Sequence, residues 1–260
     1  MLQGNQAGFC AEIEEAVTGD LVRRWFEDPV AIKHYVRATA AVGLWSSEEK
    51  VFPAAFSLDQ RILDVGCGTG RITFGLWKLG FRRLAGVDFS PAMIEAARDI
   101  GRALGADIPF QVGDATCLEV PAPAFDGAIF GFNGLMQIPG RANRRKALRC
   151  LRALVAGGGK LVFTSHDRAF PSARAHWRQT SEGTLRPPKN RGELEFGDRV
   201  GRTEEGSIFM HWPDRTEVLD DLAATGWRHL EDHARSLIAN ESEAVRAFSD
   251  ECRFWICRKE

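Results

Sequence analysis

The sequence predicts an α/β fold in which an open, mostly parallel sheet carries helices on both faces. Between residues 61 and 166, five short apolar runs alternate with segments of helical spacing. A turn rich in glycine, at residues 66–70, follows the first run. A helical segment and two strand-like runs then end the chain, which suits an antiparallel pair at one sheet edge. Alternating apolar strands and helices are typical of right-handed parallel β-α-β units.

The first 59 residues are predicted to be helical and to form a unit of their own. Asp28 and Pro29 match a helix N-cap followed by proline in the first turn. Ser46 and Glu49 have the spacing of a capping box and predict another helix start. We therefore expect an N-terminal helical cap over 1–59 and an α/β domain over 60–260.

The five strands of the α/β domain are predicted from their apolar runs: RILDV, RLAGVDF, PFQVGDA, FDGAIFGF and KLVFTSH. Helical spacing predicts the connections RITFGLWKL, AMIEAARDIGRAL after the Ser90-Pro91 cap, and RANRRKALRCLRALV, which the glycines 157–159 would end. Residues 168–207 are polar and break this rhythm. We interpret them as a lid inserted after the fifth strand, over the carboxyl edge of the sheet.

The composition of the chain restricts which partners and which cellular location are expected. The chain has 260 residues, 44% of them hydrophobic, and a formal net charge of -1. That balance disfavours nucleic acid or an anionic membrane as the main partner. No secretion signal, membrane span or C-x-x-C spacing is visible, so six reduced cysteines, no metal site and a cytoplasmic location are expected. The oligomeric state stays open.

The glycine turn and the ends of the next strands predict a nucleoside site. A dinucleotide-binding turn has the pattern G-x-G-x-x-G, but Arg71 stands where the last glycine would be. Asp88 ends the second strand, 20 residues after Gly68, where a carboxylate can accept both ribose hydroxyls. Asp114 and Ala115 end the third strand, where they suit an adenine edge. Such a site suits a nucleoside without phosphates, and S-adenosylmethionine fits.

These motifs resemble the class I S-adenosylmethionine-dependent methyltransferases. The resemblance lies in ILDVGCGTGRIT, GVDFSPAMIEAAR, FQVGDAT, FDGAIFGFNGLMQIP and LRALVAGGGKLVFTSHD, over roughly residues 60–167. It implies a Rossmann-like sheet of seven strands in the order 3-2-1-4-5-7-6, with strand 7 antiparallel. It also implies that the helical cap folds over the cofactor and that S-adenosylhomocysteine is the product.

The resemblance assigns roles to individual residues. Asp64, Gly66, Gly68 and Gly70 would line the methionine side of the cofactor, although Asp64 and Gly70 could serve only the turn. The cofactor's nucleoside would contact Asp88, Met93, Asp114 and Ala115, with Met93 also on a core stripe. Phe132 and Asn133 would contact the methionine amino group and begin the acceptor site.

Three residues are candidates for a catalytic base. His166, beside Asp167 after the fifth strand, is the best placed, because imidazole titrates near neutral pH. A histidine that caps the strand end is the alternative. His211 could project from the lid edge, and Tyr35 could close the site from the cap. Five aromatic residues predict either an enclosed apolar pocket or a small core of the lid itself: Phe170, Trp177, Phe196, Phe209 and Trp212.

Several functions remain open at this point. A methyltransferase of small molecules is favoured, with a nitrogen, oxygen, sulfur or carbon atom as the acceptor. An RNA or protein methyltransferase could instead use a basic helix made of Arg141, Arg144, Arg145, Lys146, Arg149 and Arg152. A regulatory protein could bind the cofactor without chemistry. A nicotinamide oxidoreductase is disfavoured by Arg71.

Overall fold

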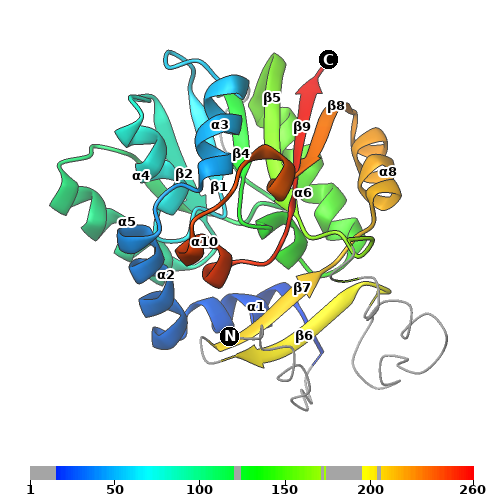
Figure 1. The fold of residues 1–260 in the computed structure, drawn as a ribbon, viewed down its shortest axis with the longest axis horizontal. Coiled ribbons are helices and arrows are strands. Elements are labelled where there is room, and N and C mark those ends of the chain that lie inside the picture. Colours follow the sequence, from blue (N-terminus) through cyan, green and yellow to red (C-terminus); the bar gives the residue numbers. More distant parts are fainter. Residues whose placement is uncertain (1–15, 120–123, 171–172, 174–194, 204–205) are drawn as a thin grey trace.

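The computed structural model describes residues 16–119, 124–170, 173, 195–203 and 206–260. It contains one large sheet with helices on both sides and a separate hairpin (Figure 1). The strands are β1 Ile62–Val65, β2 Leu84–Asp88, β3 Phe110–Val112, β4 Phe125–Phe130, β5 Val155–Ser165, β6 Asp198–Thr203, β7 Gly206–His211, β8 Trp227–Ala234 and β9 Arg253–Lys259. The helices are α1 Gly19–Phe26, α2 Pro29–Ala41, α3 Ser46–Ala55, α4 Arg71–Lys78, α5 Pro91–Leu104, η2 Gly134–Gln137, α6 Arg141–Leu154, α8 Arg215–Thr225, α9 Arg235–Ile238 and α10 Glu243–Phe248. None of the helices in the described ranges is both long and apolar enough to cross a lipid bilayer.

The sheet order confirms the predicted fold class. The seven strands run β3-β2-β1-β4-β5-β9-β8. Strands β1 to β5 pair in parallel, whereas β9 is antiparallel to both of its neighbours, β5 and β8. Counted without the hairpin, this is the expected order 3-2-1-4-5-7-6 with an antiparallel strand 7.

Two hydrophobic layers hold the helices on the sheet. Alternate residues of β1 point to opposite faces, as the pleat of a strand requires, so Leu63 and Val65 lie in one layer and Ile62 in the other. The first layer joins the sheet to α6 and α8, and the second joins it to α3, α4 and α10. Helix α3, from the N-terminal segment, therefore shares a core with the sheet.

Local signals placed most helix starts correctly. The carboxylate of Asp28 accepts a hydrogen bond from the Val30 N–H, and the Ser90 hydroxyl accepts one from the Met93 N–H. The predicted capping box is displaced by one residue, because the Glu48 carboxylate, not that of Glu49, accepts from the N–H of the N-cap residue Trp45. Glu48 is fully buried, so its long-range partners decide which residue caps the helix.

Two predictions about the segments around the fifth strand need correction. Helix α6 ends at Leu154, and the glycines 157–159 lie in β5, where the pairing with β4 shifts register. Residues 206–211 form β7, which pairs only with β6 among the described strands, so the expected lid boundary at 207 falls inside a hairpin. Figure 1 shows this hairpin (yellow) beside α1 (blue), apart from the main sheet.

Candidate functional site

A cavity of about 520 Å³ lies at the carboxyl ends of the parallel strands. The turn after β1 and the ends of β2, β3 and β4 form one wall, and α1, Tyr35 and residues 137–143 form the other. Ligands bind at this edge in open α/β sheets, because loops that leave neighbouring strands in opposite directions open a crevice there. Of the residues predicted to hold the cofactor, those on the wall are Gly66, Gly68, Asp88, Met93, Asp114, Ala115 and Phe132.

The glycine turn brings bare backbone to the cavity. Gly66 and Gly68 line it with φ of 61° and 55°, a left-handed conformation that favours glycine. A Cβ on Gly68 would have only Tyr35 within 4 Å, at 3.9 Å, so the space in front of this residue is open. Gly70, with φ of 87°, is the N-cap of α4 and faces Phe74 instead of the cavity, which matches the alternative of a turn residue.

Asp88 is a buried carboxylate on the cavity wall. Its Oδ2 accepts a hydrogen bond from the Gly68 N–H at 2.8 Å, and its Oδ1 accepts one from the Ser90 N–H at 2.9 Å. Burial raises the pKa of Asp88 to about 6, although the two backbone bonds lower it. Each carboxylate oxygen has a second lone pair, so the ionised group can still accept two hydroxyl donors from a ligand.

Asp114 follows β3 on the same wall. Its side chain is exposed, and its Oδ1 accepts a hydrogen bond from the Thr116 N–H at 2.7 Å. Asp114, Ala115 and Thr116 together place a carboxylate and a backbone turn at one end of the cavity. Asp88 lies between this turn and the glycine turn.

Comparison with known proteins assigns this arrangement to a family. Residues 62–159, which span β1 to β5 and this wall of the cavity, match the family model described as a methyltransferase domain. Residues 62–159 therefore form a methyltransferase domain, and the chain as a whole is similar to class I S-adenosylmethionine-dependent methyltransferases. Its fold resembles the crystal structure of a methyltransferase of this kind from Methanosarcina mazei, with a TM-score of 0.63 and 19% identity, over 81% of this chain and 97% of that one.

Curated methyltransferases are similar over part of their length. A demethylmenaquinone methyltransferase of Thermus thermophilus is 36% identical over 106 residues, which are 40% of this chain and 46% of that protein. A ubiquinone biosynthesis O-methyltransferase of Coxiella burnetii is 32% identical over 111 residues, which are 43% of this chain and 45% of that protein. The chain thus spans about half the length of these relatives.

Asp64 lies behind the glycine turn and not on the cavity wall. It is 3% exposed, and its Oδ2 accepts a hydrogen bond from the Thr73 hydroxyl of α4 at 2.5 Å. Burial raises its pKa to about 7, although the bond from Thr73 lowers it. Its contacts match the alternative in which it serves the turn.

We expect Asp64→Asn to raise the free energy of unfolding at pH 8 by about 1–3 kcal/mol, because asparagine keeps an acceptor for Thr73 without a buried charge. The folded-state pKa lies above the unfolded value, so the destabilisation by Asp64 grows as pH rises from 3.8 to about 7. The gain should therefore be absent near pH 4. Urea unfolding at both pH values tests this, with the exposed Asp99→Asn as control. An equal effect at both pH values would contradict it.

The predicted base His166 does not reach the cavity. Its Nδ1–H donates to the Glu251 carbonyl at 3.0 Å, and its Nε2 accepts from the Asn133 amide at 3.2 Å. Burial lowers the pKa of His166, which favours this neutral form. The ring also stacks on Trp212 at 4.2 Å. Both nitrogens are engaged inside the protein, so the alternative of a structural histidine at the strand end fits the contacts.

Asn133 and Phe132 form a strained corner after β4. Both adopt positive φ, 59° and 49°, which residues other than glycine rarely do. The corner turns Phe132 to the cavity and buries Asn133, whose N–H donates to the Thr164 hydroxyl at 2.8 Å. Asn133 therefore supports the wall from behind and is not among the residues that line it.

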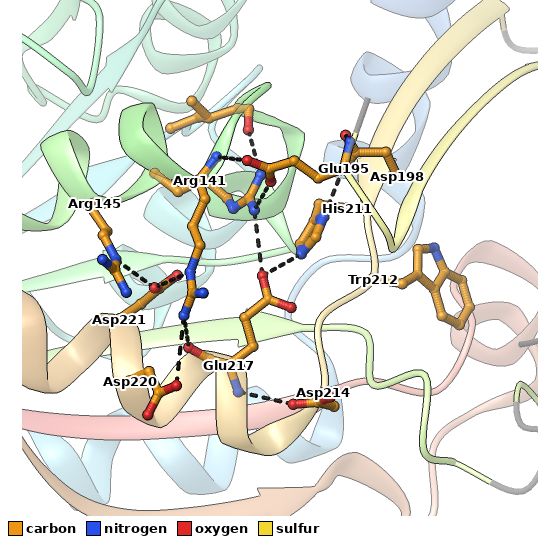
Figure 2. A network of polar contacts seen from close by, with 12 residues as sticks. Arg141, Arg145, Glu195, Asp198, His211, Trp212, Asp214, Glu217, Asp220 and Asp221 are labelled. Carbon is orange, nitrogen blue, oxygen red and sulfur yellow. Dashed lines mark hydrogen bonds and ion pairs between the residues drawn. The ribbon is translucent and has the colours of Figure 1, made fainter. Parts of the chain in front are cut away.

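Of the three predicted catalytic residues, only Tyr35 lies on the cavity wall. His211 is 1% exposed and hydrogen-bonds two carboxylates, Asp198 at 2.7 Å and Glu217 at 2.8 Å (Figure 2). Although burial opposes its charge, these bonds raise the pKa of His211 above its usual value. Both ring nitrogens are engaged by carboxylates inside the protein, so neither is placed to take a proton from a molecule in the cavity.

The described lid aromatics fit the alternative of a small core better than that of an apolar pocket. Those within the described residues are Phe170, Phe196, Phe209 and Trp212, and none of them lines the cavity. Phe209 is fully buried, and Trp212 stacks on His166, as members of a small core would. Trp177 lies outside the described residues.

Most arginines of the basic helix α6 form hydrogen bonds or ion pairs with other residues of the protein. Arg141 and Arg145 both bind the Asp221 carboxylate of α8, at 2.6 and 2.7 Å. Arg144 is 1% exposed and binds Glu195, and Arg152 donates to the Gly226 carbonyl. This helix is therefore less suited to docking a polyanion than its composition suggests.

The second wall of the cavity contains residues that the sequence did not single out. They are Thr18, Gly19, Asp20, Val22, Arg23, Phe26, Gln137, Ile138, Pro139 and Asn143. Helix α1 has a strongly one-sided apolar pattern, and Leu21 and Val22 are buried. That pattern indicates a packed helix but not which ligand it faces.

Proposed function

We propose that the protein is an enzyme that transfers the methyl group of S-adenosylmethionine to a nitrogen, oxygen, sulfur or carbon atom of a small-molecule acceptor. One observation carries the proposal. A single cavity joins the nucleoside-binding features, Asp88 and the glycine turn, to a second wall built by α1 and residues 137–143. A cofactor on the first wall would face an acceptor on the second.

The residues present fit this cofactor. Gly68 offers open backbone beside the buried Asp88, whose oxygens keep free lone pairs for a ribose. Asp114 and Ala115 offer a carboxylate and a backbone N–H to an adenine edge. When bound, S-adenosylmethionine supplies an electrophilic methyl group on a sulfonium.

The protein's contribution is alignment and exclusion of water. Positioning the two reactants can lower the barrier by about 7–11 kcal/mol. The titratable residues among the described lining are Asp20, Arg23, Tyr35, Asp88 and Asp114, with no histidine, cysteine, lysine or glutamate. We infer that the acceptor does not pass a proton to an imidazole of the described lining, which a thiolate, an ionised phenol or a weakly basic aromatic amine satisfies.

A small-molecule acceptor is supported by the named activities of the relatives, which include demethylmenaquinone and ubiquinone-biosynthesis methyltransferases. The aromatic side chains Phe26, Tyr35, Phe89 and Phe132 on the wall suit a flat ring. The five described cysteines are free, which supports the proposed cytoplasmic location.

Two measurements test the proposal. Calorimetric titration with S-adenosylmethionine, S-adenosylhomocysteine and NAD should give binding of the first two and none of NAD. Incubation with methyl-labelled cofactor and a panel of phenols, quinols, amines and thiols should then give a labelled product. Binding without transfer to any acceptor would favour a regulatory protein, and binding of NAD alone would overturn the proposal.

A further inference from the structure

The β6–β7 hairpin depends on side chains for its position. Its two strands pair with each other and form a sheet separate from the main one. An isolated two-stranded hairpin is at best marginally stable in water. Strand β7 packs against α1 and η2, and both of these elements line the cavity on the side assigned to the acceptor. The hairpin therefore backs that wall.

The buried imidazole ring of His211 connects this hairpin to helix α8. His211, the last residue of β7, contacts Asp198 of β6 through Nδ1 at 2.7 Å and Glu217 of α8 through Nε2 at 2.8 Å (Figure 2). Carboxylates only accept hydrogen bonds at neutral pH, so both nitrogens carry hydrogen and the ring is an imidazolium.

The surrounding charges make that proton necessary. The anionic groups around the ring are Glu195, Asp198, Asp214 and Glu217, and the cationic ones are Arg144 of α6 and Arg168, which follows β5. Both carboxylate oxygens of Glu195, both of Asp198 and both ring nitrogens of His211 have hydrogen-bond partners within the protein. Without the proton, a buried carboxylate would face a nitrogen lone pair, which is repulsive.

The same network touches the cavity wall. The Arg144 guanidinium donates to the carbonyl of Ile138 at 3.4 Å, and Ile138 lines the cavity. Glu195, which binds Arg144 at 2.7 Å, also accepts from the Arg141 N–H at the first turn of α6. Charged side chains thus connect the β6–β7 hairpin to the first turn of α6 and to the cavity wall at Ile138.

We propose that His211 is a positioning residue that, as an imidazolium, fixes the β6–β7 hairpin against the acceptor-side wall of the cavity. The assignment of that side rests on the proposed function. The cofactor-side wall comes from the ends of β1 to β4, and within the described residues no hydrogen bond or ion pair of the network reaches these strands. Loss of the proton should therefore loosen mainly the other wall. Burial opposes the charge of His211, but the two hydrogen bonds outweigh it and raise its pKa, so the hairpin should be released as pH rises through the raised pKa.

Hydrogen exchange tests the proposal without any acceptor. At neutral pH, His211→Gln should lower the protection of peptides from β6, β7 and η2 by about tenfold and leave β1 and β2 unchanged. Affinity for S-adenosylhomocysteine, measured by calorimetry, should stay within about threefold of wild type. The matched control is His229→Gln, because His229 also binds a carboxylate, that of Asp232 at 2.9 Å, but on β8. Control and wild type should behave alike.

Asp198→Asn gives a second route if His211→Gln fails to fold. Asparagine keeps one oxygen to accept from Nδ1–H, while its NH₂ group faces the Glu195 N–H, and it no longer favours the charged ring. The pH at which hairpin protection is lost should therefore fall. Unchanged protection in His211→Gln, equal loss across the whole sheet, or an unshifted pH profile in Asp198→Asn would overturn the proposal. Failure of the proposed function would appear differently, as absence of S-adenosylhomocysteine binding by the wild type.

Discussion

Asp88→Asn is expected to weaken S-adenosylhomocysteine binding by about 100-fold, which corresponds to two charge-assisted hydrogen bonds of about 1.5 kcal/mol each. The substitution removes the charge and replaces one acceptor oxygen by an NH₂ group. Both oxygens already hold backbone N–H groups, of Gly68 and Ser90, so the NH₂ group would also face a donor. Calorimetry on the folded variant measures the affinity.

The control for this experiment is Asp99→Asn. Asp99 is an exposed residue of α5 that pairs with Arg102, outside the cavity. The Asp99→Asn variant should bind S-adenosylhomocysteine with the affinity of the wild type. Affinity of Asp88→Asn within about threefold of wild type would show that Asp88 only supports the turn.

The pH dependence gives an independent measurement on the same group. The pKa of Asp88 is about 6 because the carboxylate is buried, and the ligand needs the ionised form. Affinity of the wild type should therefore fall by up to about tenfold per pH unit below that value, and Asp88→Asn should lack this dependence. Protonation of Asp88 does not itself unfold the protein over this range, because a raised carboxylate pKa destabilises the fold as pH rises, not as it falls.

The cavity wall that we assign to the cofactor could be predicted to form, because each of its residues follows its own strand in the sequence. Parallel strands end at the same edge of a sheet, so Gly68, Asp88 and Asp114 meet there once the strands are placed. The acceptor half could not be predicted in this way. His166 finds its partner Glu251 85 residues away, and α1 reaches the cavity by packing against elements distant in the sequence.

The sequence indicated what Arg71 excludes but not which residues it contacts. Its position in the glycine turn disfavoured a dinucleotide site, and the family match agrees. The sequence did not show its role. The guanidinium turns away from the cavity to the Glu48 carboxylate of α3, with bonds of 2.6 and 2.7 Å, and also donates to the Gly43 carbonyl. It therefore connects the N-terminal helices to the start of α4.

Glu48→Gln is expected to lower the free energy of unfolding by about 3–5 kcal/mol, because it leaves a buried guanidinium without its anion. The Glu48 side chain is fully buried and that of Arg71 is 9% exposed, so water cannot replace the lost partner. Glu48 also accepts from the Trp45 N–H at the start of α3, and Trp45 packs under the Arg71 guanidinium at 4.9 Å. Urea unfolding at neutral pH measures the change.

The matched control is Glu260→Gln, which breaks the exposed pair with Arg228 and should cost less than about 1 kcal/mol. The double variant Glu48→Leu with Arg71→Met should be more stable than either single variant, since it leaves no unpaired buried charge. A loss below about 1 kcal/mol in Glu48→Gln would contradict the argument. Because Arg71 directly follows Gly70, the single variants should also lower the affinity for S-adenosylhomocysteine, which would connect the stability of the helical cap to the geometry of the glycine turn.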